Sequence, residues 1–272
     1  MDLKTVSYDL ADRVATITLN RPHRLNAWTG RMHTEYRWCL ARAEADPEAR
    51  VIIVTGAGRA FCAGADTAAL EGHIAKGGYD PGTDPAELAM PGFGVRPEFD
   101  ANFAYHFGLT KPVIAAINGP AAGVGLVLAC FADLRFAVAS AKLTTAHGKL
   151  GLPAEYGLSW LLPRLIGVTH ANDLLLSSRV VLAEEANRMG LLNGCFETVE
   201  EMVEHTRAYA VMLASQVSPS SIKETKRQVY ADLHGDAAAA VRESEDLLNR
   251  MMTEPDYREG VRAFVAKRPP RF

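Results

Sequence analysis

The 272-residue sequence is poor in the residues that build disulfide frameworks and metal clusters. Its four cysteines, Cys39, Cys62, Cys130 and Cys195, lie far apart and form no CxxC pair. Its eight histidines show no HxxxH or HxH spacing. These absences argue against a zinc knuckle or a disulfide scaffold. We expect free, mostly buried thiols and assign no metal.

Clustered positive charge and long apolar runs are also missing. The net charge is −3, and no block of five or more lysines and arginines occurs, which argues against a nucleic-acid partner. Residues 1–13 contain no apolar signal core, and the longest apolar stretch, Val124–Ala132, is too short to cross a bilayer. The prediction is a cytoplasmic protein without membrane contact.

Nucleotide-binding glycine motifs are incomplete. Gly56-Ala-Gly58 follows a predicted strand, but Phe61 stands where GxGxxG has its third glycine, and no helix is expected directly after it. No Walker lysine motif occurs either. A dinucleotide or nucleoside triphosphate site is therefore not expected.

Strand and helix signals alternate in the first half of the chain. With 48% hydrophobic and 22% charged residues, the chain can bury one sizeable core, with or without a small appended domain. Expected elements are a hairpin of Val6–Leu10 and Val14–Leu19, a helix over Thr29–Asp46, and wholly or largely apolar strands at Val51–Val54, Val113–Ile117 and Leu134–Ala139. Buried strands separated by helices predict an α/β layered core.

Two segments depart from this alternation. Gly72–Pro97 holds six glycines and four prolines, which predicts a long loop or flap over a ligand. After Gly157 the pattern is helical, with helices expected at Leu158–Ile166, Ala171–Ser177, Ala183–Met189, Glu200–Gln216, Pro219–Leu233, Asp236–Met252 and Asp256–Val265. We divide the chain into an α/β core, residues 1–200, and a helical region for assembly, residues 201–272.

Two glycine-bearing loops follow buried strands, at residues 55–66 and 118–127. Ligands of α/β proteins gather at the carboxyl ends of strands. Gly123–Gly125 directly precede an apolar helical run, so free N–H groups and the positive end of a helix dipole converge there. This loop is a candidate anion site.

Four ordered motifs resemble the crotonase (enoyl-CoA hydratase/isomerase) superfamily. They are Asn20-Arg-Pro-His-Arg-Leu-Asn-Ala27, Gly58-Arg-Ala-Phe-Cys-Ala-Gly-Ala-Asp66, Lys111-Pro-Val-Ile-Ala-Ala-Ile-Asn-Gly-Pro-Ala-Ala-Gly-Val-Gly125 and Gly151-Leu-Pro-Ala-Glu-Tyr-Gly157. The resemblance implies an α/β fold of the crotonase type, a spiral of ββα units with a C-terminal helical trimerisation region. It also implies a homotrimer or a dimer of trimers. The substrate would be an acyl group carried as its coenzyme A thioester, with no permanently bound cofactor.

The resemblance also assigns roles to residues. The backbone N–H groups of Ala65 and Val124 would form an oxyanion hole for the thioester, and such donors stabilise negative charge by about 3 kcal/mol each. Residues placed along the coenzyme would be Arg24, Ala60, Ala63 and Asp66, with Phe264 and Lys267 closing over the nucleotide from a neighbouring subunit. For Arg24 a solvated turn residue is the alternative, and for Asp66 a helix N-cap.

The acid–base residues depart from the family pattern. Family hydratases use two glutamates, but Val127 and His147 stand at these positions. Glu155 aligns with an acidic position that dienoyl-CoA isomerases of the family use to carry a proton, and burial would raise its pKa. Its alternative role is to neutralise the start of the next helix. His147 is either a general base or acid or a polar wall of the pocket.

His33 lies near Trp28 in the first expected helix. It is either a partly buried helix residue or a counterpart of the histidines that some carbon–carbon bond hydrolases of this superfamily place in comparable regions. The leading functional hypothesis is double-bond isomerisation or hydration of an acyl-CoA by proton transfer through Glu155. Two alternatives remain: a β-diketone hydrolase using His147, and a catalytically silent scaffold that binds a CoA thioester or RNA.

Overall fold

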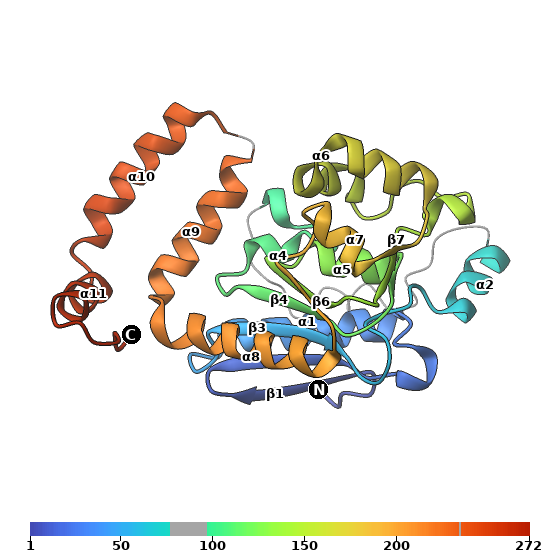
Figure 1. Ribbon diagram of the computed structural model, residues 1–272, viewed down its shortest axis with the longest axis horizontal. Helices are drawn as coiled ribbons and strands as arrows, with labels where there is room; N and C mark the ends of the chain where they lie inside the picture. Colours follow the sequence, from blue (N-terminus) through green and yellow to red (C-terminus); the bar gives the residue numbers. More distant parts are fainter. Residues whose placement is uncertain (77–96, 234) are drawn as a thin grey trace.

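The computed structural model describes residues 1–76, 97–233 and 235–272. Within these residues a six-stranded sheet has the order β1-β2-β3-β4-β6-β9, and a three-stranded sheet has the order β5-β7-β8 (Figure 1). The strands are β1 (Val6–Ala11), β2 (Val14–Leu19), β3 (Val51–Gly56), β4 (Val113–Ile117), β5 (Ala121–Ala122), β6 (Leu134–Val138), β7 (Lys142–Thr144), β8 (Val181–Leu182) and β9 (Gly194–Phe196). The predicted α/β class is confirmed.

The N-terminal hairpin is the antiparallel part of the large sheet. β1 pairs with β2 from Val6 opposite Leu19 to Ala11 opposite Val14. Asp12 and Arg13 close the turn with φ values of 51° and 64°, the positive range that tight hairpin turns require. From β2 onwards every pair in this sheet, β2-β3, β3-β4, β4-β6 and β6-β9, is parallel.

Helices cover both faces of the large sheet, and many of these helices lie between its strands in the sequence. The helical segments are η1 (Pro22–Arg24), α1 (Gly30–Ala45), α2 (Thr67–Lys76), η2 (Pro97–Phe99), α4 (Tyr105–Gly108), α5 (Val124–Cys130), η3 (His147–Leu150), α6 (Leu158–Ser177), α7 (Ala183–Arg188), α8 (Val199–Gln216), α9 (Pro219–Asp232), α10 (Ala237–Met251) and α11 (Pro255–Val265). Thr29 is the N-cap of α1, because its hydroxyl accepts a hydrogen bond from the Met32 N–H at 3.1 Å.

Alternate residues of the strands point to different cores. Ile53, Ile114 and Phe136 belong to a cluster with Met202 and Ala210 of α8, and Figure 1 shows α8 lying along this face of the sheet. The opposite face enters a larger cluster with α1, α5 and α6. Both faces of the parallel strands are therefore buried, as their apolar runs predict.

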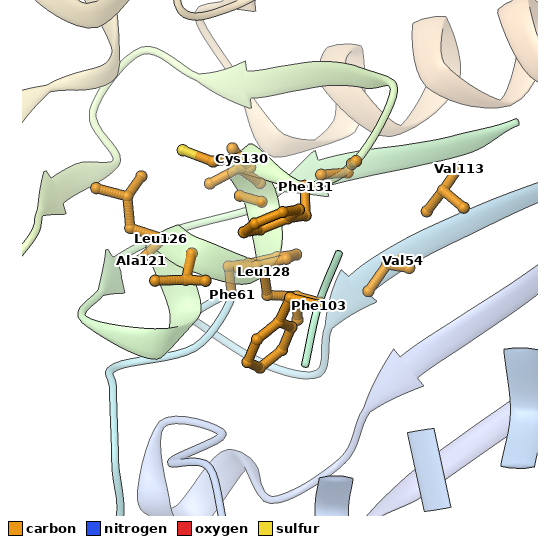
Figure 2. Packing of buried hydrophobic residues seen from close by; sticks show 14 of the residues in the cluster. Val54, Phe61, Phe103, Val113, Ala121, Leu126, Leu128, Cys130 and Phe131 are labelled. Carbon is orange, nitrogen blue, oxygen red and sulfur yellow. The ribbon is translucent and has the colours of Figure 1, made fainter. Parts of the chain in front are cut away.

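Part of the larger cluster surrounds α5. Figure 2 shows the side chains of Phe103, Leu128 and Phe131 near one another, and the ring centroids of Phe103 and Phe131 are 6.5 Å apart. This packing holds α5 rigidly beneath the glycine loop that precedes it.

The helical C-terminal region begins to leave the core at α9. α8 starts next to the predicted boundary at residue 200, yet it packs on the sheet and belongs structurally to the core. α9 is anchored through Asp133, whose carboxylate accepts hydrogen bonds from Lys226 Nζ at 2.8 Å and from the Tyr230 hydroxyl at 2.7 Å. Beyond it, α10 and α11 extend to one side of the molecule (Figure 1).

Two local predictions need correction. Residues 72–76 of the glycine-rich segment belong to α2, and Pro97 begins η2, so these ends of the predicted loop are helical. The remainder, residues 77–96, lies outside the described residues. The two helices expected on either side of Gly167 form α6, which is kinked where Gly167 has φ 72° and ψ 161°.

A buried carboxylate fixes the start of β1. Glu35 of α1 is only 2% exposed and accepts hydrogen bonds from the backbone N–H groups of Lys4, Thr5 and Val6 at 2.7 to 3.2 Å. Arg31 Nε also donates to it at 2.7 Å. Burial alone raises the pKa of Glu35, but these hydrogen bonds outweigh it and hold the pKa below the ordinary value.

Glu35→Gln should lower the free energy of unfolding by about 2–3 kcal/mol at pH 7, because a charged acceptor of several buried donors is lost. The folded-state pKa is depressed, so this stabilisation is complete above the unfolded pKa of about 4.3 and is lost as the pH falls through the folded value. Urea unfolding at several pH values measures the effect, and the exposed Glu48→Gln serves as the control. An equal loss in both variants, or one independent of pH, would contradict this account.

Candidate active site

The site is built where two chain segments run side by side beyond the carboxyl ends of β3 and β4. Cys62 and Ala121 form a parallel bridge, with the Cys62 N–H donating to Pro120 O at 3.1 Å and the Ala122 N–H donating to Cys62 O at 3.0 Å. Ala65 and Val124 each lie three residues beyond this bridge. The bridge therefore brings together the two segments that carry the predicted oxyanion donors.

The N–H groups of Ala65 and Val124 have no acceptor among the described residues. Around Ala65, the Trp28 N–H donates to Gly64 O at 2.7 Å and the Asp66 N–H donates to Trp28 O at 3.0 Å, so Ala65 itself turns its N–H away from this partner. Val124 is the first residue of α5, and the first N–H groups of a helix lack an intrahelical acceptor.

Glycines allow the close approach of the two segments. A β-carbon at Gly125 would lie 2.2 Å from Cys62 O, and one at Gly119 would lie 2.3 Å from Arg59 O. Both distances are far shorter than a van der Waals contact. The backbones touch at these points, and only glycine fits between them.

Two buried asparagines hold the first loop, residues 57–66. Asn26 Nδ2 donates to Ala57 O at 2.9 Å and to Ala60 O at 2.7 Å. Asn118 Nδ2 donates to Gly56 O at 2.8 Å and to Gly58 O at 2.9 Å. Neither asparagine is among the site residues predicted from the sequence. Asn118 could have been found, because an asparagine directly after a buried strand and before a glycine is a signal for an amide that holds a loop.

A third segment joins the site through β7. β5 pairs with β7 in parallel, and the Gly123 N–H donates to Thr144 O at 3.0 Å, so the turn after β7 brings His147 towards the second loop. His147 Nε2 lies 3.0 Å from Leu175 O. A carbonyl only accepts, so Nε2 carries the proton and, in the neutral ring, Nδ1 carries the lone pair.

Ser178, at the C-terminal end of α6, fixes this turn. Its hydroxyl oxygen accepts hydrogen bonds from the Gly148 N–H and the Thr145 hydroxyl, both at 3.0 Å. Ser178 is fully buried and has φ 46°. The sequence gave no sign of this contact, because it joins residues some thirty positions apart through tertiary packing.

Glu155 lies in the turn before α6, and its side chain approaches the second glycine-bearing loop, residues 118–127, at Gly123. Its Oε2 lies 3.9 Å from the position that a β-carbon at Gly123 would occupy. The carboxyl is partly buried. Burial raises its pKa, while the nearby His147 opposes this shift. Val127, in contrast, is a buried apolar residue of α5, so only one carboxylate of the predicted set stands beside the donors.

The residues expected along the coenzyme are partly brought together. Arg24 is an exposed residue of η1, whose Pro22 contacts the first loop at Gly58. Asp66 is 8% exposed, accepts from the Ala68 N–H at 3.0 Å and pairs with Arg21 at 2.9 Å. Burial raises the pKa of Asp66, but the hydrogen bonds from Arg21 and the Ala68 N–H outweigh this effect and hold the pKa below the ordinary value. The bond to the Ala68 N–H places Asp66 as a cap at the start of α2.

Ala60 is buried and Ala63 is partly buried in the same loop, where the Ala63 N–H donates to Leu25 O at 3.0 Å. Phe264 and Lys267 lie at the end of α11, on the opposite side of the molecule from α2 (Figure 1). Phe264 is 86% exposed. Within one chain these two residues do not meet the loop.

Four rings form an aromatic wall between the first loop and Glu155. Phe103 is its centre, with ring centroids 5.6 Å from Trp28, 5.7 Å from His33 and 5.1 Å from Tyr156. Trp28 flanks Ala65 through its backbone, and Tyr156 follows Glu155 in sequence. Trp28 and His33 were noted from the sequence, but Phe103 and Tyr156 were not. No periodicity links these four residues, because they come from three distant segments.

This arrangement comprises two backbone N–H groups without an acceptor among the described residues, one carboxylate of raised pKa and a wall of aromatic rings. It can hold an oxygen that gains negative charge and move a proton beside it. In the described ranges, no group of three or more His, Cys, Asp and Glu side chains is placed to hold a metal ion. No helix there is long and apolar enough to span a membrane. Two free backbone donors near a carboxylate are the features expected of an acid–base enzyme that stabilises an oxyanion.

Comparison with known proteins gives the family. The family model described as Enoyl-CoA hydratase/isomerase matches residues 9–272. The chain therefore belongs to the enoyl-CoA hydratase/isomerase family, and it is an enzyme of that family with the crotonase fold. The resemblance drawn from the four motifs is confirmed.

Relatives in this family carry several names. The chain is 35% identical to a probable enoyl-CoA hydratase of Rhodobacter capsulatus, over 100% of this chain and 99% of the relative. It is 36% identical to the 1,2-epoxyphenylacetyl-CoA isomerase of Escherichia coli, over 95% and 94%. A crystal structure of a probable enoyl-CoA hydratase/isomerase from Mycobacterium abscessus has a TM-score of 0.84 and 31% identity, covering 99% of both chains.

Gly125→Ala should separate the two donor-bearing segments, because its methyl group would clash with the Cys62 backbone. We expect a loss of about 1–3 kcal/mol of stability and a far larger fractional loss of activity. Gly72→Ala in α2, where an added β-carbon meets nothing within 4 Å, is the matched control. Thermal unfolding and turnover of both variants test this, and an active, stable Gly125→Ala would refute the close approach.

Proposed function

We propose that this enzyme binds an acyl-CoA thioester, stabilises its enolate with the N–H groups of Ala65 and Val124, and moves a proton through Glu155. The observation that carries the proposal is the position of Glu155 Oε2 beside Gly123, the residue before the second donor. Double-bond isomerisation is the favoured reaction, and hydration is the slower one. The family membership and the names of the relatives support thioester chemistry.

The chemical step follows from one carboxylate and two donors. Glu155 removes an α- or γ-proton, and the electrons of that C–H bond pass into the thioester carbonyl, whose oxygen gains negative charge between the two N–H groups. The protonated Glu155 then returns the proton to another carbon of the dienolate. The double bond migrates and no other reactant is needed. Water addition is disfavoured, because Val127 cannot serve as the second acid or base.

His147 plays a supporting role in this proposal. Its Nε2 is engaged by Leu175 O, and its proximity opposes the rise in the pKa of Glu155. Cleavage of a β-diketone with His147 as the base is the rival outcome, and a silent scaffold would show no proton exchange at all.

The coenzyme lies, in this proposal, along the first loop. Ala60 and Ala63 leave room for the adenine and pantetheine arm, and Arg24, exposed on η1, meets the phosphates. Asp66 acts mainly through the loop, since both of its carboxylate oxygens already have protein partners. Phe264 and Lys267 complete the nucleotide site from a neighbouring subunit.

Glu155→Gln should slow exchange of substrate protons with deuterated buffer by about 10²- to 10⁴-fold. Acyl-CoA affinity, measured by thermal protection, should stay nearly unchanged. Because the basic form is required and burial raises the pKa, wild-type exchange should increase as the pH rises through a value above about 4.3 and then level off.

His147→Ala should reduce exchange less than Glu155→Gln, and the remote Glu48→Gln should leave it unchanged. Rapid hydration of crotonyl-CoA that survives in Glu155→Gln would show that the acid–base residue has been misplaced. Cleavage of free diketones that disappears in His147→Ala would support the hydrolase instead.

We further propose that the enzyme assembles as a homotrimer or a dimer of trimers. Apolar side chains remain exposed on the C-terminal helices, including Leu248, Met252, Phe264 and Val265. A cavity of about 340 Å³ lies between α9 and the amino-terminal ends of β4 and β6, with apolar lining from Leu213, Ile222 and Val229 among others. Surfaces of this kind are typical of subunit contacts.

Light scattering should report three or six times the 29.5 kDa mass of one chain. Phe264→Asp should weaken assembly and, because Phe264 is expected to reach the neighbouring site, also reduce acyl-CoA affinity. Asp246→Asn on α10 tests whether any surface change has this effect. A monomer that binds acyl-CoA fully would contradict both the assembly and the shared site.

A further inference from the structure

His33 is an unusual member of the aromatic wall. It is 7% exposed, and its buried Nε2 has no hydrogen-bond partner in the part of the chain that the structure describes. Its ring packs at 5.9 Å from Trp28 and 5.7 Å from Phe103. A buried polar atom without a partner weakens the folded state, so a native example calls for an explanation.

The polar rings just behind it are paired. The Tyr36 hydroxyl donates to His106 Nε2 at 2.7 Å, and His106 Nδ1 donates to Phe103 O at 2.5 Å. Burial lowers the pKa of His106 to about 4. This chain of hydrogen bonds fixes Phe103, whereas His33 Nε2 has no hydrogen-bond partner among the described residues.

His33 is neutral under ordinary conditions. Burial, together with Arg37, lowers the pKa of His33 to about 4. A neutral ring nitrogen is a weak partner for an ion but a good one for a hydroxyl group, which can donate to it or accept from it in either tautomer. The surrounding rings favour a flat apolar group that stacks or packs edge to face.

The position of His33 ties it to the proposed chemistry. Trp28 flanks the donor residue Ala65, and Phe103 joins Trp28 to Tyr156 beside Glu155. The wall therefore lies beside the segment that carries the first proposed donor. Since the two N–H donors are assigned to the thioester oxygen, a group that meets Nε2 would belong to another part of the acyl chain.

We propose that His33 Nε2 forms a hydrogen bond with a hydroxyl group on an aromatic acyl chain, at the end remote from the thioester. The inference rests on the proposed acyl-CoA function and narrows its substrate class. Because Nε2 is buried, a ring of the wall must turn to admit the hydroxyl. The isomerase relative named for a phenylacetyl thioester agrees with an aromatic substrate.

The test compares phenylacetyl-CoA with 4-hydroxyphenylacetyl-CoA by calorimetric binding to the intact enzyme. The wild type should bind the hydroxylated thioester about tenfold more tightly. His33→Leu should bind both thioesters with nearly equal affinity and should unfold at the same or a higher temperature, because an unpaired polar atom has been removed. His33→Gln, which keeps a hydrogen-bonding side chain, should retain part of the preference.

The exposed His170→Leu on α6 is the matched control and should bind as the wild type does. An equal preference in wild type and His33→Leu, or a His33→Leu that is less stable while keeping the preference, would overturn the inference and leave the acyl-CoA function standing. If neither thioester, nor any other acyl-CoA, bound the wild type, the proposed function and this inference would both fail.

Discussion

The contact on which the site depends is the direct approach of two backbones at Gly125 and Cys62. A methyl group at Gly125 would lie 2.2 Å from Cys62 O. The loop after β3 can therefore contact the start of α5 at this point because Gly125 has no side chain. The parallel bridge between Cys62 and Ala121 aligns the two segments just before Ala65 and Val124. Because the proposed oxyanion donors are main-chain groups, a valine at position 124 does not prevent this role.

Around this fixed centre, buried amides and hydroxyls take the place of further secondary structure. Asn26 and Asn118 pair with loop carbonyls, and Ser178 holds the turn that carries His147. Each of these polar groups is buried and paired, so the loops they hold are rigid despite their irregular backbone. His33 differs from these residues: it is buried as they are, but its Nε2 has no hydrogen-bond partner among the described residues.

Electrostatics gives Glu155 its properties. Burial shifts its pKa upwards and His147 moderates the shift, while the buried Val127 contributes no charge. Of the described residues at the predicted acid–base positions, Glu155 alone is a carboxylate, whereas the family pattern of a hydratase has two glutamates. The proposed preference for proton relocation over water addition rests on this difference.

The sequence by itself determined the α/β class, the hairpin, the buried strands and the family, because apolar periodicity and glycine-bearing motifs are local properties that survive without coordinates. It also predicted Ala65, Val124 and Glu155 as site residues, and these assignments remain predictions. Only the tertiary structure decided that α8 belongs to the core, that Asp66 caps α2, and that Trp28, His33, Phe103 and Tyr156 form one wall. The reason is physical: these relations join residues far apart in the chain, and burial, pairing and pKa depend on which of them meet.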